Sequence, residues 1–223
     1  MEEQTKDNYT WSFSSLKQYQ NCPKQYHEIR VLKNYTVKEN EAMIYGKEVH
    51  LALENYVRDG IELAKNYQQF KSMVDGLIAI KGEKLCEHEM ALTRDRKPCD
   101  FHSEDRYCRG IADLIIIDGD YAFVVDYKTG SNKYPDTKQL KLMALMIFEH
   151  FPEVNTVKGG LMFVAKNSFI TAQYKREDKD KHWKTFEKIL TRLDLAYEYD
   201  NWRPNPTPLC GWCSVKTCEF QKT

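Results

Sequence analysis

Long apolar runs are absent from this sequence. None approaches the roughly 20 consecutive apolar residues that a membrane-spanning helix requires, which argues against a membrane protein. The opening residues, MEEQTKDNYTWS, are polar and acidic and lack the basic start and apolar centre of a secretory signal. We therefore expect a cytoplasmic protein, in which thiols stay reduced and disulfides are not the first explanation for seven cysteines.

Net charge is absent as well, because lysine plus arginine and aspartate plus glutamate number 33 each. The simplest indication of nucleic-acid binding, an excess of basic residues, is therefore missing. A local basic groove would suffice for such binding, and the acidic residues of a metal site would count against the total. Hydrophobic residues make up 42% of the chain, which is enough for a sizeable core and argues against disorder.

Internal repeats, low-complexity tracts and linkers rich in proline or glycine are also missing, so we predict a single domain over residues 1–223. Hydrophobic periodicity, capping residues and turn residues predict its elements. Helices are expected near 12–21, 23–32, 42–58, 62–82, 137–150 and 178–198, and strands near 87–93, 109–117, 121–126, 157–165 and 168–175. This order predicts an α/β fold with a mixed central sheet flanked by helices.

Two carboxylates and one ammonium are predicted to meet on neighbouring strands. Asp126 and Lys128 lie two residues apart, so their side chains point to the same side of a strand. Asp113 lies on the preceding strand, and the turn signal Asp118-Gly119 pairs the two strands antiparallel. Both strands are otherwise apolar, and burying charge among isoleucine and valine is costly unless the charge is paired or bound to metal.

This grouping suits metal-dependent hydrolysis of a phosphodiester. Two carboxylates with a main-chain carbonyl, here assigned to Tyr127, form a hard oxygen site for Mg²⁺ or Mn²⁺. Such a metal polarises the phosphate and lowers the pKa of a bound water. Lys128 would position that water, help to deprotonate it or stabilise charge in the transition state. A surface salt bridge at a strand end is the alternative, and a D-x-K pattern standing alone would favour it.

The sequence around these residues resembles the RecB-like branch of the PD-(D/E)XK nucleases. G-I-A-D, ending at Asp113, and V-V-D-Y-K-T-G, which contains Asp126 and Lys128, are similar to motifs II and III of that branch. Upstream, S-x-S-x-L-x-x-Y-x-x-C-P from Ser12 resembles its N-terminal signature, and G-K-E-V-H, ending at His50, resembles its motif I helix.

Downstream, Gln139 opens a segment similar to the Q-x-x-x-Y motif of the same branch, although Met143 stands at the tyrosine position, so the contacts of that tyrosine are lost. Each motif alone is weak, but five in order, from Ser12 to Cys218, are a strong indication. The resemblance implies a restriction-endonuclease-like core and a deoxyribonuclease.

The resemblance also implies that His50 is a further metal ligand and that Gln139 helps to hold the active site or the DNA. From the residues alone, His50 on a mostly apolar helix face would be a packed histidine, and Gln139 an ordinary residue at a helix start. Glu87 and Glu89 lie on the strand before Asp113. Exposed strand charges are the favoured interpretation of both, with a role near the metal or the DNA as the alternative.

Three cysteines lie close together near the end of the chain. Cys210-x2-Cys213 presents two thiolates to one metal, and Cys218 is within reach of the same centre. Cys22, in a Cys-Pro pair, and this trio together resemble the iron–sulfur subgroup of RecB-like nucleases, which includes the AddB nuclease domain and the CRISPR-associated adaptation nucleases. The resemblance implies a [4Fe–4S] cluster that joins the N- and C-terminal segments. Zn²⁺ is the alternative. The other cysteines are expected to be core or incidental thiols: Cys86, Cys99 and Cys108.

Aromatic residues beside basic ones are candidates for stacking on bases. They are Tyr26, Tyr134 and Tyr174. Lys133 and Lys138 flank the predicted site and are candidates for phosphate contacts. For any one of these residues, an ordinary solvated surface is the alternative.

The predicted substrate is DNA, and the predicted activity is that of an exonuclease on single strands or duplex ends. The small form resembles stand-alone nucleases of phages and CRISPR adaptation systems, and a protein partner in repair, recombination or CRISPR adaptation is compatible with it. A catalytically reduced DNA-binding or assembly subunit is one alternative, against which the intact Asp113, Asp126 and Lys128 argue. An endonuclease or a ribonuclease on the same core is the other.

Overall fold

The computed structural model describes residues 9–133 and 135–221. The chain divides into two compact units, which we call the sheet unit (Asn40–His182) and the terminal unit (Met1–Glu39 with Trp183–Thr223). Residues 1–8, where the prediction on a secretory signal falls, and Tyr134 lie outside the described residues. No helix in the described part of the chain is both long enough and apolar enough to cross a membrane.

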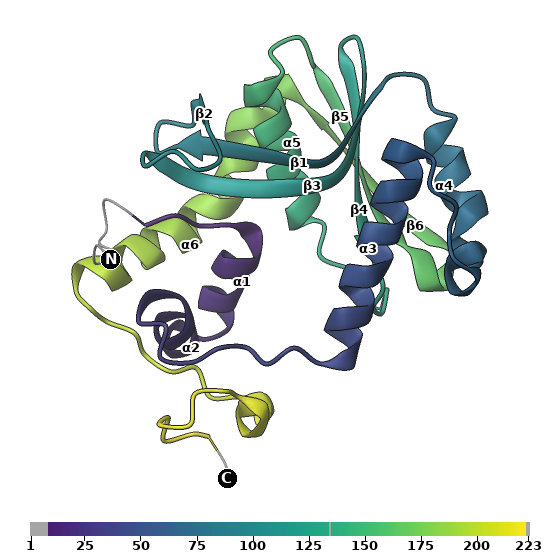
Figure 1. Ribbon diagram of the computed structural model, residues 1–223. Coiled ribbons are helices and arrows are strands. Elements are labelled where there is room, and N and C mark those ends of the chain that lie inside the picture. The colour runs from purple at the N-terminus through teal and green to yellow at the C-terminus, as the bar shows by residue number, and fades with distance from the viewer. Residues whose placement is uncertain (1–8, 134, 222–223) are drawn as a thin grey trace. The chain divides into compact units, whose positions relative to one another are not determined.

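A six-stranded mixed sheet forms the centre of the sheet unit, in the order β2-β1-β3-β4-β5-β6 (Figure 1). The strands are β1 (Glu83–Thr93), β2 (Pro98–Cys99), β3 (Arg106–Asp118), β4 (Tyr121–Lys128), β5 (Thr156–Phe163) and β6 (Ser168–Lys175). β4 and β5 pair in parallel, because helix α5 (Lys138–His150) crosses over between them, and the other described pairs are antiparallel. The predicted mixed sheet with flanking helices is confirmed.

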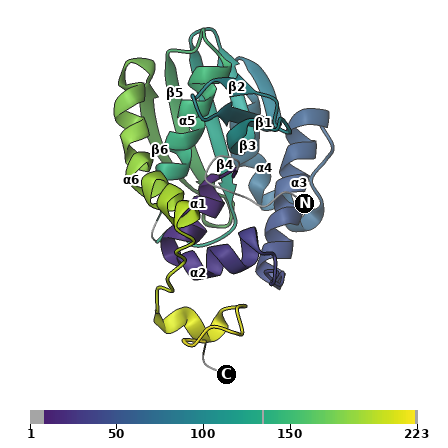
Figure 2. The same ribbon diagram turned by 90° about the vertical axis from the view of Figure 1, so that its left-hand side faces the viewer.

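Helices cover both faces of this sheet. α3 (Glu41–Asp59) and α4 (Lys71–Ile78) lie on one face and α5 on the other (Figure 2). A buried cluster joins α3 and α4 to the sheet, with Val49 and Leu53 of α3 packed among Leu114, Val125 and other apolar strand residues. Burial of this cluster fixes α3 against the end of the β3–β4 hairpin, which is where the predicted site lies.

The helix expected over residues 62–82 is only partly right. Lys65–Phe70 forms a 3-10 turn, α4 is a helix, and the chain leaves the helix after Ile78. Gly82 causes part of this difference, because its φ of +131° disfavours other residues and a Cβ there would lie 2.4 Å from the carbonyl oxygen of Ile117. The chain turns at this glycine and enters β1, which begins four residues before the predicted start at residue 87.

Two strands continue beyond the rest of the sheet. β3 pairs with β4 only from Leu114 to Asp118, whereas its pairing with β1 continues to Arg106. The far halves of β1 and β3, residues 88–93 and 106–112, therefore form an antiparallel ribbon with the short β2 at its edge (Figure 1). We call this segment the β1–β3 ribbon.

The terminal unit is built from short helices and aromatic packing. Its elements are α1 (Phe13–Asn21), α2 (Pro23–Tyr26), a π-helical turn (His27–Val31), a 3-10 turn (Pro208–Trp212) and α6 (Lys179–Glu198), which begins in the sheet unit. The Ser12 side chain caps the N-terminus of α1. The ring of Tyr9 stacks on Tyr197 with centroids 4.5 Å apart, and Tyr26 packs against Trp202.

Candidate active site

The β3–β4 hairpin brings Asp113 beside the end of β4. A two-residue turn, Gly119-Asp120, follows the paired residues Asp118 and Tyr121, and Gly119 supplies the positive φ of 60° that the turn requires. The turn lies one residue further along than predicted. From the register Leu114↔Val125, Asp113 falls opposite Asp126.

The β3–β4 ladder is interrupted at this point by a side chain. The backbone N–H of Tyr127 donates to Asp113 Oδ2 over 2.6 Å, in place of a strand carbonyl. The strands can therefore diverge here without leaving the buried N–H of Tyr127 unpaired. No described contact involves the Tyr127 carbonyl as a ligand, so its assignment to the metal stays a prediction.

Asp126, Lys128 and Gln139 form a closed set of contacts. Lys128 Nζ lies 2.5 Å from Asp126 Oδ2 and donates to Gln139 Oε1 over 3.0 Å. Gln139 Nε2 in turn donates to Asp126 Oδ1 over 2.5 Å. The predicted convergence of Asp126 and Lys128 on one side of β4 is thus present, and Gln139 reaches both of them from the first turn of α5.

His50 approaches the carboxylates from α3. Its Nδ1 lies 3.4 Å from Asp113 Oδ1, and its ring meets the Tyr127 ring edge-on. Gly46, one helical turn earlier, permits this approach because a Cβ there would lie 3.3 Å from Oγ1 of Thr129. Gly46 and His50 thus lie on the face of α3 that packs against the end of β4, and the missing side chain of Gly46 lets the helix come close there.

Glu87 also belongs to the site, and the prediction that it is an exposed strand charge is wrong. The register pairs Cys86 with Leu114 and His88 with Ala112, which places Glu87 opposite Asp113. Glu87 has a φ of +46° and is half-buried, whereas Glu89 is exposed as predicted. Glu87, Asp113 and Asp126 therefore form a row of carboxylates across three neighbouring strands.

Burial and the charge of Asp113 raise the pKa values of two carboxyls in this row, those of Glu87 and Asp126. Burial raises the pKa of Glu87 to about 7, and the charge of Asp113 adds to the effect. Burial and then Asp113 raise the pKa of Asp126 to about 6, against the opposing effect of Lys128. For His50, burial lowers the pKa, but the hydrogen bond and charge of Asp113 outweigh burial, and the pKa is raised overall.

These residues fit a divalent cation. His50, Glu87 and Asp113 are the one group in the described part of the chain whose potential ligand atoms all lie within 4.8 Å of one another. Asp126 Oδ2 is buried without a well-directed hydrogen bond, although Lys128 Nζ is close. Carboxylate oxygens with one imidazole suit Mg²⁺ or Mn²⁺, and a cation would relieve the repulsion between the carboxylates.

Comparison with known proteins agrees with this geometry. Residues 10–218 match the model of the PD-(D/E)XK nuclease superfamily. The chain belongs to this superfamily. Its mixed sheet is accordingly a restriction-endonuclease-like core, and PD-(D/E)XK nucleases use divalent metals and act on DNA. No curated protein sequence matches the chain.

Two solved structures share the fold of this PD-(D/E)XK chain. The crystal structure of SSO0001 has a TM-score of 0.52 at 15% identity and covers 100% of this chain and 90% of its own. A "Putative exonuclease" from Eubacterium rectale has a TM-score of 0.55 at 12% identity and covers 98% of this chain and 91% of its own. At these identities the likeness establishes the fold.

The predicted cluster cysteines of this PD-(D/E)XK chain all lie in the terminal unit. Cys22, Cys210, Cys213 and Cys218 are half-buried and line one pocket. Their sulfurs do not gather within 4.8 Å as a metal-binding group in the described residues, and Cys108 is the one buried cysteine among the seven. The fold thus brings the four residues to one pocket without a compact thiol cluster.

The candidates for base stacking are mostly wrong. Tyr26 and Tyr174 are 1% and 5% exposed, so both belong to the core, and Tyr134 lies outside the described residues. Met143, at the tyrosine position of the Q-x-x-x-Y motif, is also buried. It packs where Gly110 has no side chain, since a Cβ on Gly110 would lie 2.7 Å from Met143 Cε. Met143 therefore serves the packing of α5 against the ribbon.

Proposed function

We propose that this protein is a metal-dependent exonuclease that hydrolyses single-stranded DNA or exposed duplex ends. The observation that carries the proposal is the convergence of His50, Glu87 and Asp113 beside the ion-paired Asp126 and Lys128. Membership of the nuclease superfamily supports hydrolysis of a phosphodiester. The likeness to a "Putative exonuclease" favours cleavage from an end.

In this proposal each side chain has a distinct task. His50, Glu87, Asp113 and Asp126, with the Tyr127 carbonyl, hold Mg²⁺ or Mn²⁺, which would polarise the phosphate and acidify a water when bound. Lys128 Nζ orients the attacking water and stabilises the charge that develops on the phosphate oxygens. Gln139 is a positioning residue, because its amide holds both Lys128 Nζ and Asp126 Oδ1 in place.

Digestion of matched linear and circular DNAs tests this function. Anaerobically purified protein with Mn²⁺ should degrade an end-labelled linear single strand and spare a closed circular single strand of the same sequence. Asp113→Asn protein is the control for contaminating nucleases. Rapid nicking of the circle would favour an endonuclease, cleavage of RNA alone would favour a ribonuclease, and metal-independent DNA binding without cleavage would favour a binding subunit.

We also propose that Cys22, Cys210, Cys213 and Cys218 hold a structural [4Fe–4S] cluster. All four are free thiols around one pocket. Three of the sulfurs accept hydrogen bonds: Cys22 from the Asn205 N–H, Cys210 from the Thr207 N–H, and Cys213 from Gln25 Nε2. A tetrahedral zinc would hold sulfurs about 3.8 Å apart. No three of these sulfurs lie within 4.8 Å of one another, and a cluster in which each thiolate binds its own iron accommodates a wider spacing than one zinc does.

Colour and metal content test the cluster. Anaerobic protein should be brown, with broad absorption near ~400 nm, and should contain iron and sulfide. Cys213→Ser should bleach it, whereas Cys86→Ser, on β1 outside the pocket, should leave it unchanged. Colourless anaerobic protein with one equivalent of zinc would contradict the cluster.

Since the family match covers both units, we further propose that residues 1–223 act as one nuclease domain.

A further inference from the structure

The β1–β3 ribbon leads away from the carboxylates and carries exposed side chains on one face, although Ala91, opposite Arg109, is buried. Along β3, Arg109 and Ile111 are exposed, Ile111 at 41%, and Asp113 is half-buried. The residues between and beside them are buried: Cys108, Gly110 and Ala112. Because side chains alternate along a strand, Arg109, Ile111 and Asp113 share one face. The opposite face is the one that α5 covers, at Gly110.

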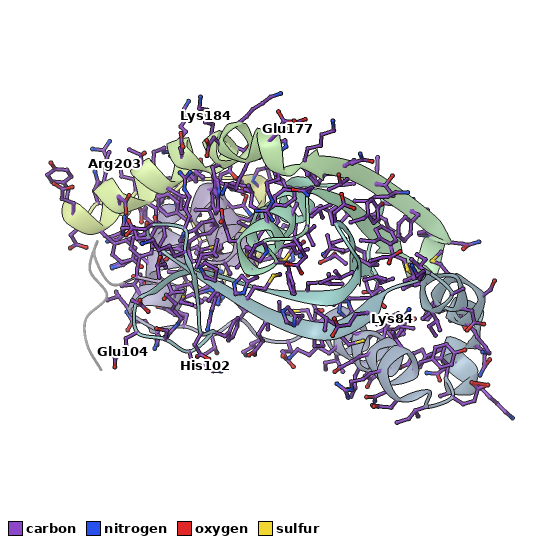
Figure 3. All side chains as sticks on the ribbon, turned by 90° about the horizontal axis from the view of Figure 1, so that it is seen from above. Lys84, His102, Glu104, Glu177, Lys184 and Arg203 are labelled. Carbon is purple, nitrogen blue, oxygen red and sulfur yellow. The ribbon has the colours of Figure 1, made fainter. Side chains whose placement is uncertain are left out.

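Arginine and aromatic side chains are stacked on this ribbon. The guanidinium carbon of Arg109 lies 5.4 Å from the centroid of the Phe101 ring, and that of Arg94 lies 4.2 Å from the Tyr107 ring. Stacking restricts the rotation of an arginine, so less freedom is lost when it binds an anion. Phe101 stands in the loop between β2 and β3, from which His102 and Glu104 project (Figure 3).

Arg109 is the charge of this face best placed for a ligand. It is exposed, and none of the described ion pairs involves it. Glu89, also exposed, lies opposite Ile111 on β1, on the side nearer the site. Moving outward from Asp113, β3 therefore presents an acidic, then an apolar and then a basic side chain on this face, with Glu89 beside the apolar one. A polyanion anchored by a cation at the carboxylates would meet Ile111 first and the guanidinium of Arg109 next.

We propose that this face of the ribbon is a track for the DNA strand, on which Arg109 holds a backbone phosphate and Ile111 packs against the intervening sugar or base. Asp113 lies four positions after Arg109 on β3, a path of about 13 Å at about 3.3 Å per residue. That length corresponds to about four nucleotides of a stacked strand at 3.4 Å each. The track rests on the proposed nuclease function, and it assigns the substrate a direction across the fold.

Binding measurements in the uncleaving Asp113→Asn background test the track independently of catalysis. Arg109→Gln should weaken binding of a single-stranded oligonucleotide about fivefold to tenfold and reduce the slope of log Kd against log salt by about 0.7, the value for one lost phosphate contact. Arg109→Lys should keep the slope. Arg58→Gln is the matched control, because Arg58 is an exposed arginine already paired with Glu54 and Asp59. Unchanged melting temperatures verify folding.

A scan with neutral methylphosphonate linkages locates the contact. With Arg109 present, one linkage about four nucleotides from the cut should weaken binding more than its neighbours. In Arg109→Gln, the same linkage should weaken binding no more than its neighbours do. If wild-type protein cleaves DNA but Arg109→Gln keeps wild-type affinity, salt slope and linkage pattern, the track is wrong and the nuclease stands. If the wild type neither binds nor cleaves DNA, both proposals fail.

Discussion

Lys128 is the side chain whose loss should separate cleavage from binding. Lys128→Ala removes the ammonium that lies against Asp126 and Gln139, while the proposed metal ligands remain. We expect the single-turnover cleavage rate with Mg²⁺ to fall by about 10²–10⁴, with DNA affinity nearly unchanged. Lys158→Ala, on β5, is the control and should cleave normally. A wild-type rate for Lys128→Ala would overturn its assignment.

Glu87 should count as a metal ligand, whereas its neighbour Glu89 should not. Glu87→Gln removes one charged oxygen from the group that contains His50 and Asp113. We expect Mn²⁺ affinity, measured by titration calorimetry on the apo protein, to fall at least about tenfold. Glu89→Gln, two residues along the same strand and exposed, should bind Mn²⁺ as the wild type does. Equal losses in the two variants would point to a general electrostatic effect instead.

The difference between the predicted and the missed residues lies in the range of the interactions. Asp113, Asp126 and Lys128 are brought together by a two-residue turn and the alternation of one strand, both of which are local in sequence. Glu87 reaches Asp113 through the pairing of β1 with β3 and through its own φ of +46°. The sequence pattern alone reveals neither the β1–β3 pairing nor the positive φ of Glu87. The row of acidic residues on three neighbouring strands of the sheet becomes visible only when their register is known.

At the scale of elements, two glycines should respond to alanine in opposite ways. In Gly159→Ala the new Cβ on β5 would lie 2.9 Å from Leu140 Cβ of α5, so α5 must shift. We expect a loss of about 1–3 kcal/mol in unfolding free energy. Gly76→Ala, inside α4 with open space around it, should gain up to about 1 kcal/mol from helix propensity. Urea denaturation measures both, and equal effects would contradict the packing described.

Helices with a regular apolar stripe were predictable, and the connection before β1 was not. α3 and α5 occupy nearly their expected ranges, because their apolar periodicity agrees with their packing. In residues 62–82 the apolar spacing is also helical, with Tyr67, Val74 and others buried. The tertiary fold nevertheless breaks the helix, since Gly82 must pass close to the backbone of Ile117. Tertiary packing overrides propensity at that point.

For the whole molecule, metal should act as a stabilising ligand. The row formed by Glu87, Asp113 and Asp126 spans β1, β3 and β4, and His50 adds α3, so one cation would cross-link four elements. Mn²⁺ at about 100 times its Kd should add about 2.7 kcal/mol, a rise of roughly 5–10 °C in melting temperature for a domain of this size. Scanning calorimetry with and without chelator measures the rise. No rise in a protein that cleaves DNA would show that metal binds only with substrate.

The same row of carboxylates is needed for the proposed cleavage but lowers the thermal stability of the metal-free protein. Without metal, three buried or half-buried acids face one another in the folded protein. Their repulsion is absent from the unfolded chain, so it lowers the free energy of unfolding. Asp126→Asn should therefore melt at a higher temperature than the wild type in chelator, yet gain less from Mn²⁺. A laboratory selection for thermal tolerance in metal-free medium would replace these acids with amides or apolar residues. Only a requirement for cleavage would keep them in the chain.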